Sequence, residues 1–174
     1  KFTKCWGRNQ TGQLGLGDTA NRGDNSGEML NLSAVSLPQG LQPISMSLGI
    51  RHTCAVLSNN RVVCWGENTQ GQIGYGLAAV DVGSTPNTMG NNLPFVNLGT
   101  DTGSPSGEPV EALYISNYSN HNCIITTDKL LKCFGENEFG QLGYEDQVNR
   151  GRGLPAGAGS NEIKLDFIEM ESVY

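Results

Sequence analysis

Short hydrophobic runs alternate with polar turns along this chain, and helical stripes of apolar residues are lacking. Residues 54–57 and 61–66 are rich in β-branched and aromatic side chains, and a polar turn separates them. Residues 123–126 and 130–134 repeat the same design. Short apolar runs joined by short polar turns are typical of β-hairpins. The pattern therefore predicts an all-β fold.

A twelve-residue pattern recurs three times without gaps, as C-(W/F)-G-x-N-x-x-G-Q-(L/I)-G-(L/Y), at residues 5–16, 64–75 and 133–144. The repetition extends upstream, where His52 and His121 each precede a cysteine at the same offset. The copies begin 59 and 69 residues apart. A repeat of about 50–70 residues built from about four strands indicates the blade of a β-propeller. We expect one repeat region over residues 1–174. Its variable linkers are residues 17–48, 76–113 and 145–166.

The fixed positions of the pattern are expected to be structural. Glycine permits positive φ or close approach of backbones, and asparagine caps turns. Aromatic residues at equivalent places on return strands favour packing between blades, and the histidines favour hydrogen bonding to a neighbouring turn. These positions are Trp6, Gly7, Asn9, Gly12 and Gln13; Trp65, Gly66, Asn68, Gly71 and Gln72; Phe134, Gly135, Asn137, Gly140 and Gln141; and His52 and His121.

The five cysteines suggest two disulfides. Cys54 and Cys64 are as far apart in sequence as Cys123 and Cys133, and each pair spans one predicted hairpin. Opposed β-carbons in a hairpin lie about 4.5–5.5 Å apart, which is close to disulfide geometry. We predict these two pairings, the alternative being free buried thiols on neighbouring strands. Cys5 is left unpaired, or available for an intermolecular bridge.

Composition and charge exclude several classes of function. The net charge is −6, and no cluster of Lys and Arg exists that could neutralise phosphates. Nucleic acids and anionic membranes are therefore not expected as partners, and no apolar stretch is long enough to insert in a membrane. The two histidines belong to different predicted blades, and no catalytic, zinc or phosphate-binding motif occurs. We expect no enzymatic activity, metal or cofactor.

Two features of the first linker have competing interpretations. The tripeptide Arg22-Gly23-Asp24 suggests an integrin ligand, but a linker turn is favoured because Asn149-Arg150-Gly151 repeats most of it. The acids Asp18, Asp24 and Glu28 have the oxygen ligands that calcium prefers, but the third repeat keeps only the acids Glu145 and Asp146.

Three glycosylation sequons occur, at Asn9, Asn31 and Asn117. Asn9 also has the turn-capping place of the pattern, which argues against modification there. Sequons arise readily by chance in a chain rich in Asn, Ser and Thr.

The three pattern segments and the upstream His-x-Cys segments resemble the RCC1-like repeats of the regulator-of-chromosome-condensation superfamily. The resemblance implies four-stranded blades, typically seven, around a central axis. About three blades fit in this chain, so an incomplete ring or open repeat array is expected. The long linkers and paired cysteines resemble a secreted subgroup. Residues 168–174 match residues 110–116, the stretch before a His-x-Cys strand.

These observations favour a non-enzymatic extracellular or cell-surface module that binds proteins or acts as a scaffold. The alternative is a subunit of a surface filament that assembles head-to-tail by strand exchange, because exposed strand edges are templates for added strands. A segment cut from a longer propeller is the simpler explanation of the blade count. Small-GTPase exchange and enzyme inhibition, both known in the superfamily, rank lower because fold alone does not specify function.

Overall fold

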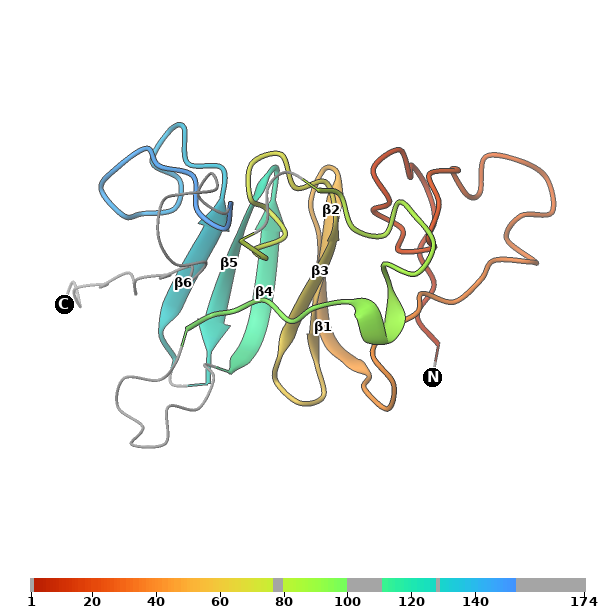
Figure 1. Ribbon diagram of the computed structural model, residues 1–174, viewed down its shortest axis with the longest axis horizontal. Helices are drawn as coiled ribbons and strands as arrows, with labels where there is room; N and C mark the ends of the chain where they lie inside the picture. The colour runs from red at the N-terminus through yellow and green to blue at the C-terminus, as the bar shows by residue number, and fades with distance from the viewer. Residues whose placement is uncertain (1, 77–79, 100–110, 128, 153–174) are drawn as a thin grey trace.

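Two antiparallel sheets stand side by side in the computed structural model, which describes residues 2–76, 80–99, 111–127 and 129–152 (Figure 1). Each sheet has three strands in sequence order. The loops of the first repeat lie beside the first sheet, at the N-terminal end of the array. The elements are β1 Pro43–Leu48, β2 His52–Leu57, β3 Val62–Gly66, the 3-10 turn η1 Gly90–Asn92, β4 Ala112–Tyr118, β5 His121–Thr126 and β6 Leu131–Gly135.

The predicted hairpins are β2–β3 and β5–β6, and both predicted disulfides close them. Cys54 lies directly opposite Cys64, with 4.1 Å between their Cα atoms. Cys123 and Cys133 have the same relationship in the second sheet. Cys5 is a free, buried thiol. The bonds form because alternation along both strands brings the cysteines to one face at opposed positions.

The expected fourth strand of each blade is reduced to one bridge in the described residues. Three isolated antiparallel bridges follow the same plan, one for each repeat. A left-handed glycine comes directly after each linker residue of a bridge, with φ near 90°. Such a backbone turns the chain away from the sheet, so pairing stops. The bridges are Gly7–Arg22, Gly66–Val82 and Gly135–Arg150, followed by Gly23, Gly83 and Gly151.

β1 was not expected as a strand, because it lies inside the predicted linker 17–48, and β4 begins inside the predicted linker 76–113. In β1, Ile44, Met46 and Leu48 alternate with serines, which is a strand pattern. The proline at its first position, Pro43, made the segment resemble a linker. Both strands are edge strands of their sheets and lie against each other across the two blades. They form the contact at the inner edge of the array.

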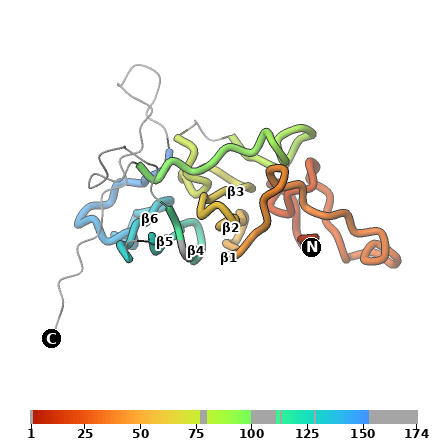
Figure 2. Tube along the Cα trace, turned by 90° about the horizontal axis from the view of Figure 1, so that it is seen from below, coloured from red at the N-terminus to blue at the C-terminus, as the bar shows by residue number. Residues whose placement is uncertain are grey.

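The core lies between the sheets and under the second linker. Trp65 and Phe134 are fully buried, as expected, together with Ile73 and Leu142. Figure 2 shows the second linker running along the side of both sheets, where Val96 N donates to Val62 O over 2.8 Å. In the residues described, no helix has the length and apolar character needed to span a membrane.

Candidate functional site: the junctions between repeats

A buried asparagine organises each repeated turn. The Oδ1 atom of Asn9 accepts from Leu14 N at 2.9 Å, and its Nδ2 atom donates to Asp18 O at 2.9 Å. Asn137 makes the same two bonds in the third repeat, to Leu142 N and Asp146 O. One side chain thus joins the turn to the start of the linker. This explains why the pattern fixes asparagine here, as the sequence predicted.

The glutamine of the pattern presents its backbone carbonyl to the next repeat. Its side chain stays within the turn, where Gln13 Oε1 accepts from Thr11 N at 3.0 Å. The carbonyl oxygen of Gln13 accepts from Thr53 Oγ1 at 2.8 Å and from Trp65 Nε1 at 3.0 Å. Two donors from the next blade therefore hold one backbone oxygen of the preceding blade.

The second junction uses the same acceptor with different chemistry. Gln72 O accepts from Asn122 Nδ2 at 2.7 Å, and Asn122 stands where the first junction has Thr53. Phe134 takes the place of Trp65 and fills the same apolar space without an N–H group. The acceptor is constant because it is a backbone atom, whereas the donors vary.

Glycine is required where the next linker crosses the turn. A Cβ atom on Gly12 would lie 2.2 Å from Ser84 N. Gly17 N donates to Gly83 O at 3.0 Å in the same crossing. The second junction repeats the arrangement, and a Cβ atom on Gly71 would lie 2.5 Å from Arg152 N. No side chain fits between backbones at this distance.

His52 adds a polar contact inside the second junction. Its Nε2 atom lies 2.7 Å from Asn122 Oδ1, so the histidine of one blade contacts the asparagine of the next. Burial lowers the pKa of His52 to about 4; the hydrogen bond to Asn122 opposes this shift and nearby His121 contributes to it. Burial also lowers the pKa of His121. A neutral His52 therefore fits the structural role that the repeat predicts.

At the inner edge of the second junction, strand β4 contacts strand β1. Asn117 N donates to Ser47 Oγ at 2.7 Å, and Asn117 Nδ2 donates to Ser47 O at 3.0 Å. Nearby, Ile50 N donates to Ser119 O at 3.1 Å. β1 and β4 are thereby connected through backbone groups and two short polar side chains. Sequence analysis missed this contact, because a serine in a presumed linker gave no sign of it.

Trp6 does not pack between blades, in contrast to the prediction. Its side chain is 62% exposed, whereas Trp65 is fully buried. Trp65 packs on the turn of the preceding repeat, and no described residue presents such a turn to Trp6. The indole instead lies beside Gly23 and Met29.

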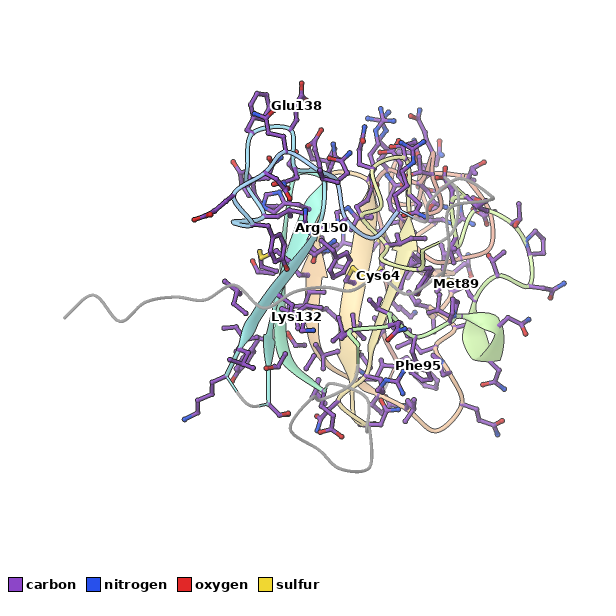
Figure 3. The ribbon with its side chains drawn as sticks, turned by 60° about the vertical axis from the view of Figure 1, so that its left-hand side comes forward. Cys64, Met89, Phe95, Lys132, Glu138 and Arg150 are labelled. Carbon is purple, nitrogen blue, oxygen red and sulfur yellow. A yellow bond between two sulfur atoms is a disulfide. The ribbon has the colours of Figure 1, made fainter. Side chains whose placement is uncertain are left out.

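The opposite end of the array is also exposed. Gly143 is open to solvent, whereas its equivalents Gly15 and Gly74 are buried beneath the aromatic residue of the next repeat. Glu138, at the tip of the third turn, marks this end in Figure 3. Among the described residues, Trp6 and the turn at Gly143 are thus exposed where their equivalents are covered.

The first linker uses its charged residues internally. The Arg22 guanidinium contacts the Asp18 carboxylate at 2.6 Å, so the arginine of the Arg-Gly-Asp sequence is not free for a receptor. The Glu28 carboxylate accepts from Gly23 N at 2.7 Å. Hydrogen bonds from Asn25 and Gly23 lower the pKa of Glu28. These acids hold a loop, and within the described parts of the chain no three His, Cys, Asp or Glu gather as a metal site requires.

The three sequons differ in access. Asn9 and Asn117 are buried and hydrogen-bonded, so both serve the structure. Asn31 is exposed in the first linker. Cys5 is buried, and burial raises the pKa of its thiol, which places it away from the surface that an intermolecular bridge needs.

Sequence models described as the Regulator of chromosome condensation (RCC1) repeat match residues 5–56, 44–72 and 115–141, which together make up more than half of the chain. The chain belongs to the RCC1 repeat family. The predicted resemblance and the all-β propeller fold are thereby confirmed.

The relatives that this chain matches are considerably longer than it is. Human protein RCC2 is 30% identical over 142 residues, which are 80% of this chain and 22% of RCC2. The ultraviolet-B receptor UVR8 of Arabidopsis thaliana is 28% identical over 113 residues, 61% of this chain and 24% of UVR8. This chain thus spans about a quarter or less of these relatives.

Solved RCC1 structures share the fold at low identity. The structure of yeast RCC1 (Prp20) bound to Kap60 superposes with a TM-score of 0.58 at 14% identity, covering 97% of this chain and 33% of that one. Prp20p from Saccharomyces cerevisiae gives a TM-score of 0.57 at 19% identity, covering 91% and 35%. The chain corresponds to about a third of such a propeller.

Proposed function

We propose that this chain is a non-enzymatic scaffold whose RCC1 repeats present variable surface residues to a protein partner. The observation that carries the proposal is the division of each repeated turn into constant buried positions and variable exposed ones. Asn9, Asn68 and Asn137 are identical and fully buried. One equivalent outer position has Gln10, Thr69 and Glu138 in the three repeats, and all three are exposed. A rigid framework with changing surface residues is how repeat folds bind partners.

Phe139 lies beside Glu138 in the third turn and is the most exposed apolar residue of the three repeated turns, at 82%. An apolar side chain held this far into solvent on an ordered turn favours contact with a partner. The solved yeast relatives support protein binding, because one is described bound to Kap60 and another with binding properties to Gsp1p and histones.

An extracellular or cell-surface location is part of this proposal. The two hairpin disulfides support it, since disulfides persist in oxidising compartments. The exposed sequon at Asn31 and the net charge of −6 agree with it.

The test measures binding of the fluorescently labelled full chain to intact cells by flow cytometry. We expect saturable binding that trypsin treatment of the cells removes and that Phe139→Ser weakens. Leu30→Ser, an equally exposed apolar position outside the repeated turn, is the matched control and keeps full binding. Binding that survives trypsin, or that both variants retain, contradicts the proposal.

Release of labelled GDP from Gsp1p distinguishes exchange activity from binding. We expect the chain to leave the release rate unchanged, and acceleration would favour an exchange factor. Exchange and enzyme inhibition rank below the scaffold because no feature of the described residues favours either one.

A filament subunit is the second candidate, and the exposure of both ends favours it. The outer face of Trp6 and the turn at Gly143 are two halves of the junction that Trp65 and Gly15 complete inside the chain. Non-closing head-to-tail contacts produce filaments. Light scattering tests this candidate: we expect growth with concentration that Trp6→Ala abolishes and Leu30→Ala does not. One monomeric mass at every concentration rejects the candidate.

A further inference from the structure

The two disulfides of this chain have equivalent places in their sheets. Each belongs to a row of three residues that are paired across the strands, with a serine of the first strand opposite the first cysteine. The rows are Ser47, Cys54 and Cys64 in the first sheet, and Ser116, Cys123 and Cys133 in the second. Directly opposed residues of an antiparallel pair lie on the same face of the sheet. Any difference in the reactivity of the two disulfides therefore arises from their surroundings.

The first row is covered by residues of the second sheet. Asn117 N donates to Ser47 Oγ at 2.7 Å, and Asn117 Nδ2 donates to Ser47 O at 3.0 Å. The Oδ1 atom of Asn122 lies 3.5 Å from Cys54 Sγ. Both Cys54 and Cys64 have an exposed fraction of 0%. A solute therefore has no access to this disulfide while the chain is folded.

The second row is accessible at its serine end. Ser116 is exposed and Cys123 is partly exposed, whereas Cys133 is buried, with an exposed fraction of 1%. Among the described residues, no hydrogen bond reaches the side chain of Ser116 as the Asn117 bond reaches that of Ser47. Residues 168–174, which match 110–116 in sequence, lie outside the described residues. The second disulfide thus has one sulfur atom within reach of solvent and one that is covered.

The direction of attack determines which sulfur atom reacts. A thiolate displaces a disulfide sulfur in line with the bond that breaks, so it approaches from the side opposite the leaving sulfur. For Cys123 this path crosses Ser116 of β4, because Cys133 lies on β6 at the other side of β5. The serine side chain is small and leaves the path open. In the first sheet, Asn117 occupies the corresponding place at Ser47.

We propose that Cys123–Cys133 is a thiol-exchange site, at which Cys123 binds a small-molecule thiol covalently while Cys54–Cys64 stays closed. The thiolate sulfur forms a bond to Cys123 Sγ, the bond to Cys133 breaks, and Cys133 leaves with the electron pair as a thiolate. A second thiolate then displaces Cys123 from the mixed disulfide. Both cysteines are thereby reduced, and two thiol molecules are oxidised to one disulfide.

This assignment gives Cys123 the role for which Cys5 was a candidate. The sequence left Cys5 available for an intermolecular bridge, but its thiol is buried. The exposed fraction of Cys5 is 7%, and those of the three other cysteines besides Cys123 are 0–1%. Cys123 is thus the most exposed of the five cysteines, and access controls the rate of thiol–disulfide exchange. A thiol on another molecule reaches Cys123 before any other cysteine of the folded chain.

Timed reduction of the full chain by glutathione under native conditions tests the proposal. Samples are quenched with acid, the free thiols are alkylated, and the modified peptides are identified by mass spectrometry. We expect Cys123–Cys133 to open at least about tenfold faster than Cys54–Cys64. The trapped mixed disulfide contains Cys123 and not Cys133. In urea, where the covering residues are removed, the two disulfides open at similar rates.

A substitution at the serine tests the path of attack. We expect Ser116→Leu to slow the opening of Cys123–Cys133 by about fivefold, because the larger side chain stands in the line of approach. Ser26→Leu, at an exposed serine of the first linker, is the matched control and leaves the rate unchanged. Urea midpoints of both variants, compared with that of the unaltered chain, separate a blocked path from a change in stability.

Three outcomes overturn the proposal. One is equal opening of the two disulfides under native conditions, which indicates that reduction requires unfolding. Another is glutathione attached to Cys133 in place of Cys123. The third is an unchanged rate in Ser116→Leu. None of these measurements depends on partner binding or on location, so this proposal and the scaffold proposal can fail separately.

Discussion

The indole Nε1 of Trp65 donates a 3.0 Å hydrogen bond to the carbonyl oxygen of Gln13, which lies 52 residues earlier in the chain. The same oxygen accepts from Thr53 Oγ1. This backbone atom is where the first two repeats are joined.

Replacing Trp65 by phenylalanine tests the value of that bond. Phe134 has the same place in the third repeat, so the ring is tolerated there. We expect Trp65→Phe to lower the free energy of unfolding by about 1–2 kcal/mol, because Thr53 still satisfies the oxygen. Trp6→Phe, at the exposed equivalent, changes it by less than about 0.5 kcal/mol. Urea denaturation measures both, and equal losses would contradict the assignment.

Gly12 and Gly140 form a natural pair for testing the close backbone approach. Both are left-handed, with φ of 79° and 74°, but a Cβ atom would meet a neighbouring backbone within 3 Å only at Gly12, since the nearest atom at Gly140 would be Asp146 O at 3.7 Å. We expect Gly12→Ala to cost about 2–4 kcal/mol and Gly140→Ala about 1–2 kcal/mol. Thermal and urea unfolding provide the comparison, and a smaller loss at Gly12 would refute the steric explanation.

Burial of His52 predicts a pH dependence. The unfolded chain has a histidine pKa near 6.5 and the folded pKa is about 4, so the unfolded state binds more protons between these values. We expect the free energy of unfolding to fall by about 2–3 kcal/mol as the pH decreases from 7 to about 4. The depressed pKa of His121 acts in the same direction.

Protonation of the Asp146 carboxylate affects stability at lower pH than protonation of His52 does. Hydrogen bonding from Arg150 lowers the pKa of Asp146 to about 2, so its contribution is lost only at lower pH. Urea midpoints between pH 7 and 4.5, with His52→Asn as control and an NMR titration of the imidazole, measure the effect. A flat profile in the unaltered chain, or an ordinary His52 pKa, would be inconsistent with a buried neutral ring.

The solvent exposure of each asparagine predicts which sequon receives a glycan in a eukaryotic secretory host. Asn31 is exposed, whereas Asn9 donates to Asp18 O and Asn117 donates to Ser47 O. We expect Asn31→Gln to remove the whole mass shift that a glycosidase releases, and Asn9→Gln to leave it intact while destabilising the turn. A glycan at Asn9 or Asn117 in folded, secreted protein would contradict the burial of those side chains.

The features predicted from sequence are those fixed by local pattern. Alternation with period two decides which cysteines oppose each other, so Cys54–Cys64 and Cys123–Cys133 followed from the hairpins. The capping role of Asn9 followed from its place among the glycines. β1 was missed because Pro43 and two serines resemble a linker, and only its pairing with β2 shows it to be a strand.

The remaining differences arise from neighbours distant in sequence. Equivalence within the repeat led to a buried Trp6, but burial depends on what lies beside a residue. The junctions could not be predicted from sequence, because their common acceptor is the main-chain oxygen of Gln13 or Gln72. Every residue has such an oxygen, so the residue type gives no sign of its role. Their donors, Thr53 and Asn122, differ and show no common pattern.

That shared acceptor bears on how such arrays grow. A main-chain oxygen is present whatever the side chain, so a newly duplicated unit finds its docking point without a compensating substitution in the older one. Only the donor side must supply a hydroxyl, an amide or an indole, as Thr53, Asn122 and Trp65 do. Units joined in this way can be duplicated, reordered or lost in evolution with little mutual adjustment.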